Sequence, residues 1–106
     1  MAKEYLGELE ELMLTMVGIL QDDAYGNAIV KEIKEQLNRD VSLASTHVTL
    51  YRLEEKGYIR SRVGGATNIR GGRRKRIFTI TSAGLAMLRS MKISRTQLWK
   101  QFPQLN

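Results

Sequence analysis

The 106-residue sequence has no cysteine, a single histidine and no long uninterrupted apolar run. Without cysteine there is no disulfide framework and no thiolate metal site, so a reducing, intracellular setting is the simplest expectation. The longest apolar stretch, residues 12–20, is interrupted by Thr15 and Gly18 and is far shorter than the ~20 residues that span a bilayer. The N-terminus also lacks the charged and apolar regions of a signal peptide. We therefore expect a cytoplasmic protein without a membrane span.

Acidic residues are missing from the chain after Glu55. All 11 Asp and Glu residues lie at or before Glu55, whereas only 6 of the 17 Lys and Arg residues lie at or before Lys56 and the other 11 follow it. The first part therefore has a net charge of −5 and the second part +11. Such a polarised chain presents a cationic surface to an anionic partner. Nucleic acid is the leading candidate, and an acidic membrane surface is the second.

Hydrophobic periodicity predicts two helices in the N-terminal part. The first spans residues 5–21, with acidic residues near its start that complement the helix dipole. From Leu12 onward its apolar residues point in nearly every direction, which is more than one core-facing stripe needs. We interpret the excess as an interface with a second copy; the alternative is a central helix buried within one small domain. The second helix is predicted over residues 26–37.

A third helix is predicted to begin after Ser42, which can cap its first turn, and to end at Gly57. Leu43, Thr46, Leu50 and Leu53 recur at steps of three and four residues and are expected to face inward. Ser45, His47, Thr49 and Arg52 are expected to face outward, where short polar groups can approach base edges or phosphates. Two helices, a short turn and this third helix give a helix-turn-helix order, with the third helix as the reader of DNA.

Two strands are predicted over residues 58–63 and 75–80, joined by a glycine-rich tip. Seven basic residues crowd this hairpin without one carboxylate: Arg60, Arg62, Arg70, Arg73, Arg74, Lys75 and Arg76. Their mutual repulsion costs stability unless a polyanion neutralises it. Our hypothesis is that the tip contacts phosphates or enters the minor groove. The alternative is a merely solvated basic tip.

A last helix is predicted from Thr81 or Ser82 to about Gln101, stopped by Pro103. Its apolar stripe has little of the domain's own core to pack against. We therefore expect this helix to pair with a second copy of the chain, against the first helix. The expected fold is mainly α with a small β-hairpin wing.

Enzymatic chemistry finds no support in the sequence. The loop at residues 64–74 lacks the Gly-Lys-Ser/Thr ending of a nucleotide-binding loop, and His47 alone makes neither a metal site nor a nucleophile–base pair. We expect no enzyme, no cofactor and no metal. His47 is either a groove contact or a surface imidazole near the core edge. Tyr25 either donates its hydroxyl to a phosphate or is a core aromatic.

Several ordered segments carry a family resemblance: residues 6–11 (LGELEE), 22–26 (DDAYG) with Ile29, 42–43 (SL), 53–59 (LEEKGYI) and 71–76 (GGRRKR), then Phe78 and Thr81 with Gly84. With these segments the sequence resembles a short member of the PadR family of bacterial transcriptional regulators. The resemblance implies a winged helix-turn-helix domain over residues 1–81 and a dimerisation helix over residues 82–106. It further implies a homodimer held by the first and last helices that reads an inverted-repeat operator and usually represses transcription. His47 stands where the family commonly has Tyr. A base or phosphate contact through a phenol therefore does not carry over unaltered.

The resemblance also implies a role for Trp99, because relatives with a tryptophan in the C-terminal helix bind flat aromatic drugs between such residues in the dimer interface. The alternative is that Trp99 only packs in the dimer interface. The predicted DNA-contacting residues are Tyr25, Gly26, Ser42, Ser45, Thr46, His47, Thr49, Tyr51, Arg52, Arg62, Arg73, Arg74, Lys75 and Arg76. The predicted dimer interface consists of Leu6, Leu9, Met13, Met16, Leu88, Met91, Leu98, Trp99 and Phe102. The alternative function is a basic winged-helix module that docks on acidic protein, a membrane surface or RNA.

Overall fold

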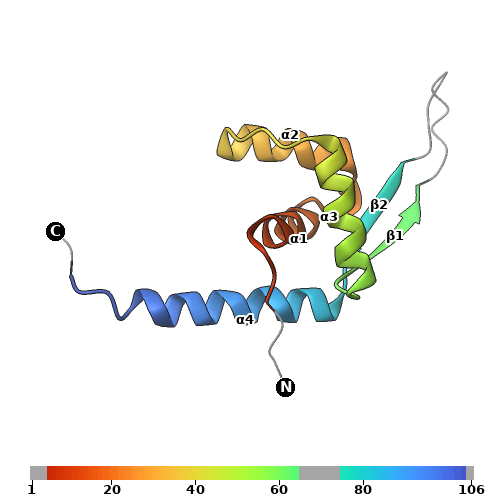
Figure 1. Ribbon diagram of the computed structural model, residues 1–106. Helices are drawn as coiled ribbons and strands as arrows, with labels where there is room; N and C mark the ends of the chain where they lie inside the picture. The colour runs from red at the N-terminus through yellow and green to blue at the C-terminus, as the bar shows by residue number, and fades with distance from the viewer. Residues whose placement is uncertain (1–4, 65–74, 105–106) are drawn as a thin grey trace.

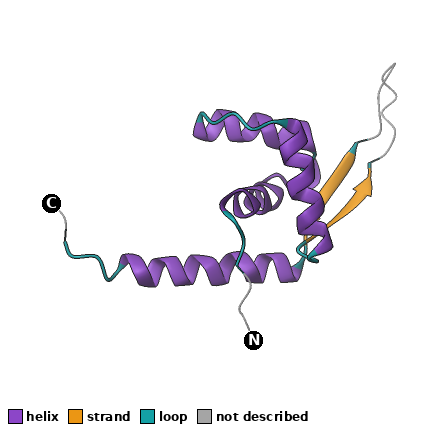
Figure 2. Cartoon of the chain, in the orientation of Figure 1, coloured by secondary structure: helices purple, strands orange, loops and turns teal. Residues whose placement is uncertain are grey.

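The computed structural model describes residues 5–64 and 75–104, which form a helical body with a protruding hairpin and one long terminal helix (Figures 1 and 2). The elements are α1 (Glu8–Leu20), the 3-10 turn η1 (Gln21–Asp23), α2 (Gly26–Leu37), α3 (Leu43–Glu55), β1 (Ile59–Val63), β2 (Arg76–Ile80) and α4 (Ser82–Trp99). The predicted mainly helical fold with a small hairpin is confirmed. Arg70, Arg73 and Arg74 lie outside the described residues.

Local capping interactions fix where the helices begin and end. Ser42 Oγ accepts a hydrogen bond from Ser45 N at 3.0 Å, and Thr81 Oγ1 accepts one from Gly84 N at 3.1 Å. Gly57 has a φ of +83°, the left-handed conformation that ends α3. The predicted helix at residues 26–37 is confirmed at both ends, whereas α1 is shorter than predicted because it begins only after its N-cap Gly7 and passes into η1 at Gln21.

Helix α1 is the centre of the core, and Figure 1 shows it surrounded by α2, α3, the hairpin and α4. Its Met13, Leu14 and Val17 are completely buried, together with Ile29 and Ile33 of α2 and Leu50, Leu53 and Phe78 from α3 and β2. The apolar residues around α1 are therefore needed because neighbouring elements cover it from several sides. This corrects the interpretation of the excess as a dimer interface for Met13, Leu14, Met16 and Val17, which the core buries, whereas Ile19 stays 51% exposed.

The two strands form an antiparallel ladder in which Ile59 faces Ile80 and Val63 faces Arg76. Phe78 N donates to the Ala24 carbonyl oxygen at 2.8 Å, which fastens the hairpin to the segment between η1 and α2. Thr81 N donates to the Tyr58 carbonyl oxygen at 3.0 Å, so the start of α4 is tied to the base of the hairpin. The basic strands therefore stand beside the helix-turn-helix rather than apart from it.

Helix α4 lies along the body at first and then extends past it (Figure 1). Met91 is buried, and the Arg95 guanidinium binds both carboxylate oxygens of Glu11 in α1, at 2.6 and 2.8 Å. Beyond this ion pair the side chains of α4 are exposed. The Cα radius of gyration, 16.0 Å, exceeds the ~13 Å of a compact chain of this length. Within residues 5–64 and 75–104, no helix has the length and apolarity that crossing a membrane requires.

Candidate nucleic-acid interface

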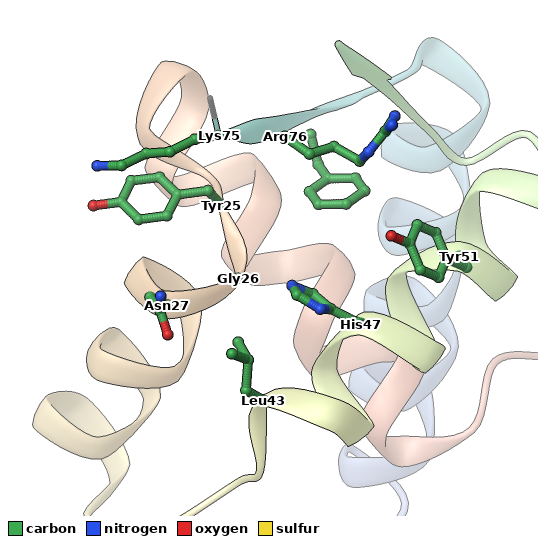
Figure 3. A pocket seen from close by; sticks show the side chains of 9 residues that line it. Tyr25, Gly26, Asn27, Leu43, His47, Tyr51, Lys75 and Arg76 are labelled. Atoms are coloured by element: carbon green, nitrogen blue, oxygen red, sulfur yellow. The ribbon is translucent and has the colours of Figure 1, made fainter. Parts of the chain in front are cut away.

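An open groove of about 410 Å³ lies where the start of α2, the first turns of α3 and the start of β2 meet (Figure 3). Tyr25, Gly26, Asn27, Leu43, His47, Tyr51, Lys75, Arg76 and Phe78 line it. Six of the predicted DNA-contacting positions thus lie around one hollow: Tyr25, Gly26, His47, Tyr51, Lys75 and Arg76. The helix-turn-helix and the hairpin therefore present one continuous surface.

Tyr25 and Lys75 join the start of α2 to the start of β2. Lys75 Nζ lies 4.1 Å from the centroid of the Tyr25 ring, within the range of a cation–π interaction (Figure 3). Tyr25 precedes the first residue of α2, where unpaired backbone N–H groups and the helix dipole favour an anion. A phosphate placed there would meet the N–H groups of α2 and the ammonium group of Lys75 together.

Gly26 allows α2 to begin directly against α3. A Cβ atom at this position would collide with His47 Nε2 and lie 3.0 Å from Leu43 Cδ1. His47 is half-buried and its ring centroid lies 6.2 Å from that of Tyr51, tilted by 40°. The histidine is therefore both a packing residue between the two helices and part of the groove wall, and Leu43, expected inward, lines the groove as well.

The outward face of α3 differs from the predicted one at Thr49, whereas Thr46 is buried as its periodicity predicts. Thr46 and Thr49 are buried, and their hydroxyls donate to the Ser42 and Ser45 carbonyl oxygens at 2.9 and 2.8 Å. Neither hydroxyl can reach DNA from this position, so the predicted contacts of Thr46 and Thr49 are wrong. The exposed positions of α3 and its N-cap are Ser42, Leu43, Ala44, Ser45, Val48, Tyr51, Arg52 and Glu55. Ala44 and Val48 were missed, although their spacing of four residues, with Tyr51 three further on, could have identified them.

Two of the hairpin's arginines have partners in the body. Arg76 Nη1 donates to Ser61 Oγ at 3.0 Å, and Ser61 Oγ donates to Glu54 Oε2 at 2.7 Å, which connects β2 through β1 to the end of α3. Arg62 lies 3.8 Å from Asp22 of η1 in an exposed pair. Arg76 remains exposed at the groove, whereas the charge of Arg62 is partly neutralised by Asp22.

Helix α3 is also held at its C-terminal end by α1. Lys56 Nζ donates to Glu10 Oε2 at 2.8 Å, and Gly7 N donates to Glu10 Oε1 at 3.0 Å. Burial raises the pKa of Glu10, but these hydrogen bonds and the nearby positive charges of Lys56 and Arg52 outweigh it, so the pKa lies below its ordinary value of 4.5. An ionised Glu10 therefore helps to fix the angle of α3.

The predicted dimer residues divide into two groups. Leu6, Met13, Met16 and Met91 are buried within one chain, and Leu9 and Leu88 are partly buried against the same core. These positions therefore do not offer a free apolar surface, which corrects the expectation for Met13 and Met16 in particular. The exposed group is Leu98, Trp99 and Phe102, at 61%, 67% and 54% exposure. Trp99 and Phe102 pack edge to face, with ring centroids 4.6 Å apart.

A helix-turn-helix whose third helix exposes its outer face beside a basic hairpin defines a winged helix-turn-helix transcription regulator. The model of the Transcriptional regulator PadR-like family matches residues 15–90. The chain belongs to this family, whose members are DNA-binding regulators and not enzymes.

Solved structures show the same fold. A PadR-like transcription factor from Bacteroides fragilis superposes with a TM-score of 0.74 at 20% identity, covering 87% of this chain and 84% of that one. A PadR family regulator from Clostridium difficile R20291 has a TM-score of 0.71 at 25% identity, covering 89% and 93%. Bacillus subtilis PadR in complex with operator DNA has a TM-score of 0.63 at 20% identity, covering 92% of this chain and 49% of that one. No curated protein matches the chain.

Proposed function

We propose that this protein is a cytoplasmic repressor that binds an inverted-repeat operator as a homodimer. Residues 1–81 form the DNA-binding domain, and residues 82–106 form the dimerisation helix. The observation that carries the proposal is the groove that sets the exposed face of α3 between the start of α2 and the basic start of β2. The resemblance in fold to the operator complex of Bacillus subtilis PadR supports it.

Each part of the surface has its own role in this proposal. The outer face of α3 enters the major groove, where Ser45, Tyr51 and Arg52 meet base edges and His47 borders the contact. The start of α2 and Lys75 bind phosphates, with Tyr25 holding Lys75 in place. Arg73 and Arg74 of the hairpin tip, outside the described residues, contact the backbone or the minor groove.

The homodimer brings two such surfaces to one duplex. The exposed residues of α4, above all Leu98 and Trp99, lie beyond the part of the helix that the body covers. Large aromatic side chains dominate the energetics of interfaces, so pairing this end of α4 with a second copy stabilises the dimer. Two α3 helices related by a two-fold axis then read the two halves of an inverted repeat.

When the operator overlaps a promoter, the bound dimer represses transcription. A flat aromatic effector that binds beside Trp99 releases the dimer from the operator. Fluorescence of Trp99, the single tryptophan, is the readout for this part of the proposal. Saturable quenching by planar aromatic compounds, with a matching loss of operator binding, supports the effector site. A flat titration means that Trp99 serves packing alone.

Operator binding is tested by fluorescence anisotropy with DNA from upstream of the protein's own gene, against scrambled DNA. The upstream DNA should compete far better, and its affinity should fall ~10³- to 10⁵-fold between about 50 and 200 mM salt if the dimer neutralises ~6–10 phosphates. Anionic lipid vesicles and structured RNA are the comparison ligands. Stronger binding to either of them than to duplex DNA would contradict the proposal and favour the interaction-module alternative.

The role of the hairpin tip is tested with the double variant Arg73→Ala/Arg74→Ala. We expect weaker binding to specific and non-specific DNA alike, and a salt dependence shallower by ~0.9 for each phosphate that the protein no longer neutralises. The matched control is Lys31→Ala/Lys34→Ala, which removes the same charge from α2, where these lysines pair with Glu35 and Asp40. Equal effects of the two double variants would show that net charge alone, and not the tip, matters.

A further inference from the structure

The exposed face of α3 has an apolar centre. Val48 is 51% exposed and lies in the middle of the helix, and its neighbours one turn before and after, Ala44, Ser45, Tyr51 and Arg52, are all exposed as well. Val48 and Ala44 are four residues apart and therefore stand one above the other on the same side of the helix. Because both are exposed, their methyl groups face outward.

This face also lacks charge. From Ser42 to Tyr51 the helix carries no Asp, Glu, Lys or Arg, and Arg52 is the first charged residue after its cap. The exposed faces of other helices differ: α2 presents Lys31, Lys34 and Glu35, and α4 presents Arg89, Lys92 and Lys100. A surface that only met water would more often resemble those faces. The uncharged strip is bordered by Arg52, Lys75 and Arg76, which attract an anionic partner.

In the major groove of a duplex the one apolar group among the base edges is the C5-methyl of thymine. Valine in a helix occupies one χ1 rotamer almost exclusively, so Val48 offers its methyl groups with little loss of side-chain entropy. We propose that Val48, with Ala44 beside it, reads thymine in each operator half-site through contact with this methyl group. The inference rests on the proposed operator binding and adds the chemical identity of a base that is recognised.

The test uses the full-length protein and an operator located by footprinting the upstream region. Each thymine of the protected half-sites is replaced in turn by deoxyuridine, which lacks only the C5-methyl group. At one or more positions, repeated symmetrically in both half-sites, wild-type affinity should fall about fourfold per methyl, the equivalent of ~0.8 kcal/mol. At the position that Val48 contacts, the variant Val48→Ala should show a smaller ratio between thymine and deoxyuridine duplexes than the wild type.

Val63→Ala is the matched control, since Val63 is 49% exposed and belongs to β1, not to the exposed face of α3. It should keep the wild-type ratio between thymine and deoxyuridine duplexes. Val48→Ala should fold normally because the position is exposed and alanine favours the helix, which an unchanged melting temperature verifies. The inference about Val48 is overturned if sequence-specific binding is unaffected by the loss of every methyl group. It is also overturned if Val48→Ala leaves the affinity ratio between thymine and deoxyuridine duplexes unchanged. Neither result would contradict the proposed operator binding. Absence of any sequence preference would contradict the proposed function as well.

Discussion

Single atoms decide how closely the elements of this protein approach one another. Gly84, in the first turn of α4, lies against the backbone of Tyr58 at the base of the hairpin. A Cβ atom there would overlap the Tyr58 carbonyl oxygen and lie 2.9 Å from Ile80 Cγ1. Because a backbone atom cannot rotate away as a side chain can, any larger residue has to displace α4.

We therefore expect Gly84→Ala to lower the free energy of unfolding by about 1–3 kcal/mol, the usual cost of overpacking. Thermal unfolding followed by circular dichroism should show a melting temperature lower by roughly 4–8 °C per kcal/mol. Gly18→Ala in the middle of α1 is the control, because its new Cβ would meet Ile80 Cδ1 at an ordinary 3.8 Å. That variant should be neutral or slightly stabilised by its better helix propensity. Identical melting temperatures for both variants would contradict the close approach at Gly84.

Pairs of elements are held by contacts that their own sequences do not reveal. Glu10 of α1 and Lys56 at the end of α3 are 46 residues apart, yet their side chains form a 2.8 Å hydrogen bond. Together with the Arg76, Ser61 and Glu54 chain, this bond fixes α3 from two sides. The helix proposed to read DNA is thus positioned by polar contacts around its C-terminal end, while its N-terminal half stays open to the groove.

The contact with Glu10 makes stability depend on pH. Since the pKa of Glu10 is lower in the folded chain than its ordinary 4.5, folding favours the ionised form. The resulting stabilisation is present above pH 4.5 and disappears as the pH falls through the folded-state pKa. Glu10→Gln should cost about 1 kcal/mol at neutral pH, and its urea-unfolding free energy should fall less steeply in acid than that of the wild type.

Glu35→Gln is the control for this prediction. Glu35 pairs with Lys31 at 4.0 Å on the exposed face of α2, and exposed pairs of this kind contribute little. It should change neither the stability at neutral pH nor its slope in acid by a measurable amount. If Glu10→Gln keeps the acid slope of the wild type, other carboxylates cause the pH dependence.

The shape of the whole molecule follows from α4. Met91 and Leu98 are seven residues apart and lie on nearly the same side of the helix, but Met91 is buried by the body whereas Leu98 is 61% exposed. Leu98 only borders the hollow that Tyr5 and Leu6 line together with α4, so most of its side chain stays uncovered. A second copy of the chain that covers the exposed end of α4 would bury Leu98 on the same side of the helix on which the body buries Met91.

Leu98→Glu should therefore convert the proposed dimer into a folded monomer, observed by sedimentation equilibrium. Operator affinity should fall by ~10²-fold or more, because each half-site is then bound without the help of the other. The matched control is Leu37→Glu at the end of α2, where the leucine is 52% exposed and far from α4 in the fold. A Leu98→Glu protein that remains dimeric would show that another surface holds the dimer.

Much of this protein is determined by local sequence. Ser42, Gly57 and Thr81 start or stop helices through bonds and dihedral angles within a few residues, and those predictions are confirmed. The separation of charge along the chain also needs no structure: an acid-free hairpin is cationic wherever it lies. The family follows as well, since its motifs are short segments of sequence.

Only the tertiary structure decided which face of each helix is buried. Thr49 is predicted on the outward face of the reader helix, yet it is buried and bonds to its own helix, while Val48 beside it is exposed. Met13 and Met16 look like surplus apolar residues, yet α1 is covered from several directions. Periodicity identifies the sides of a helix, but burial depends on which distant elements pack against them, and those contacts are set by the assembled fold.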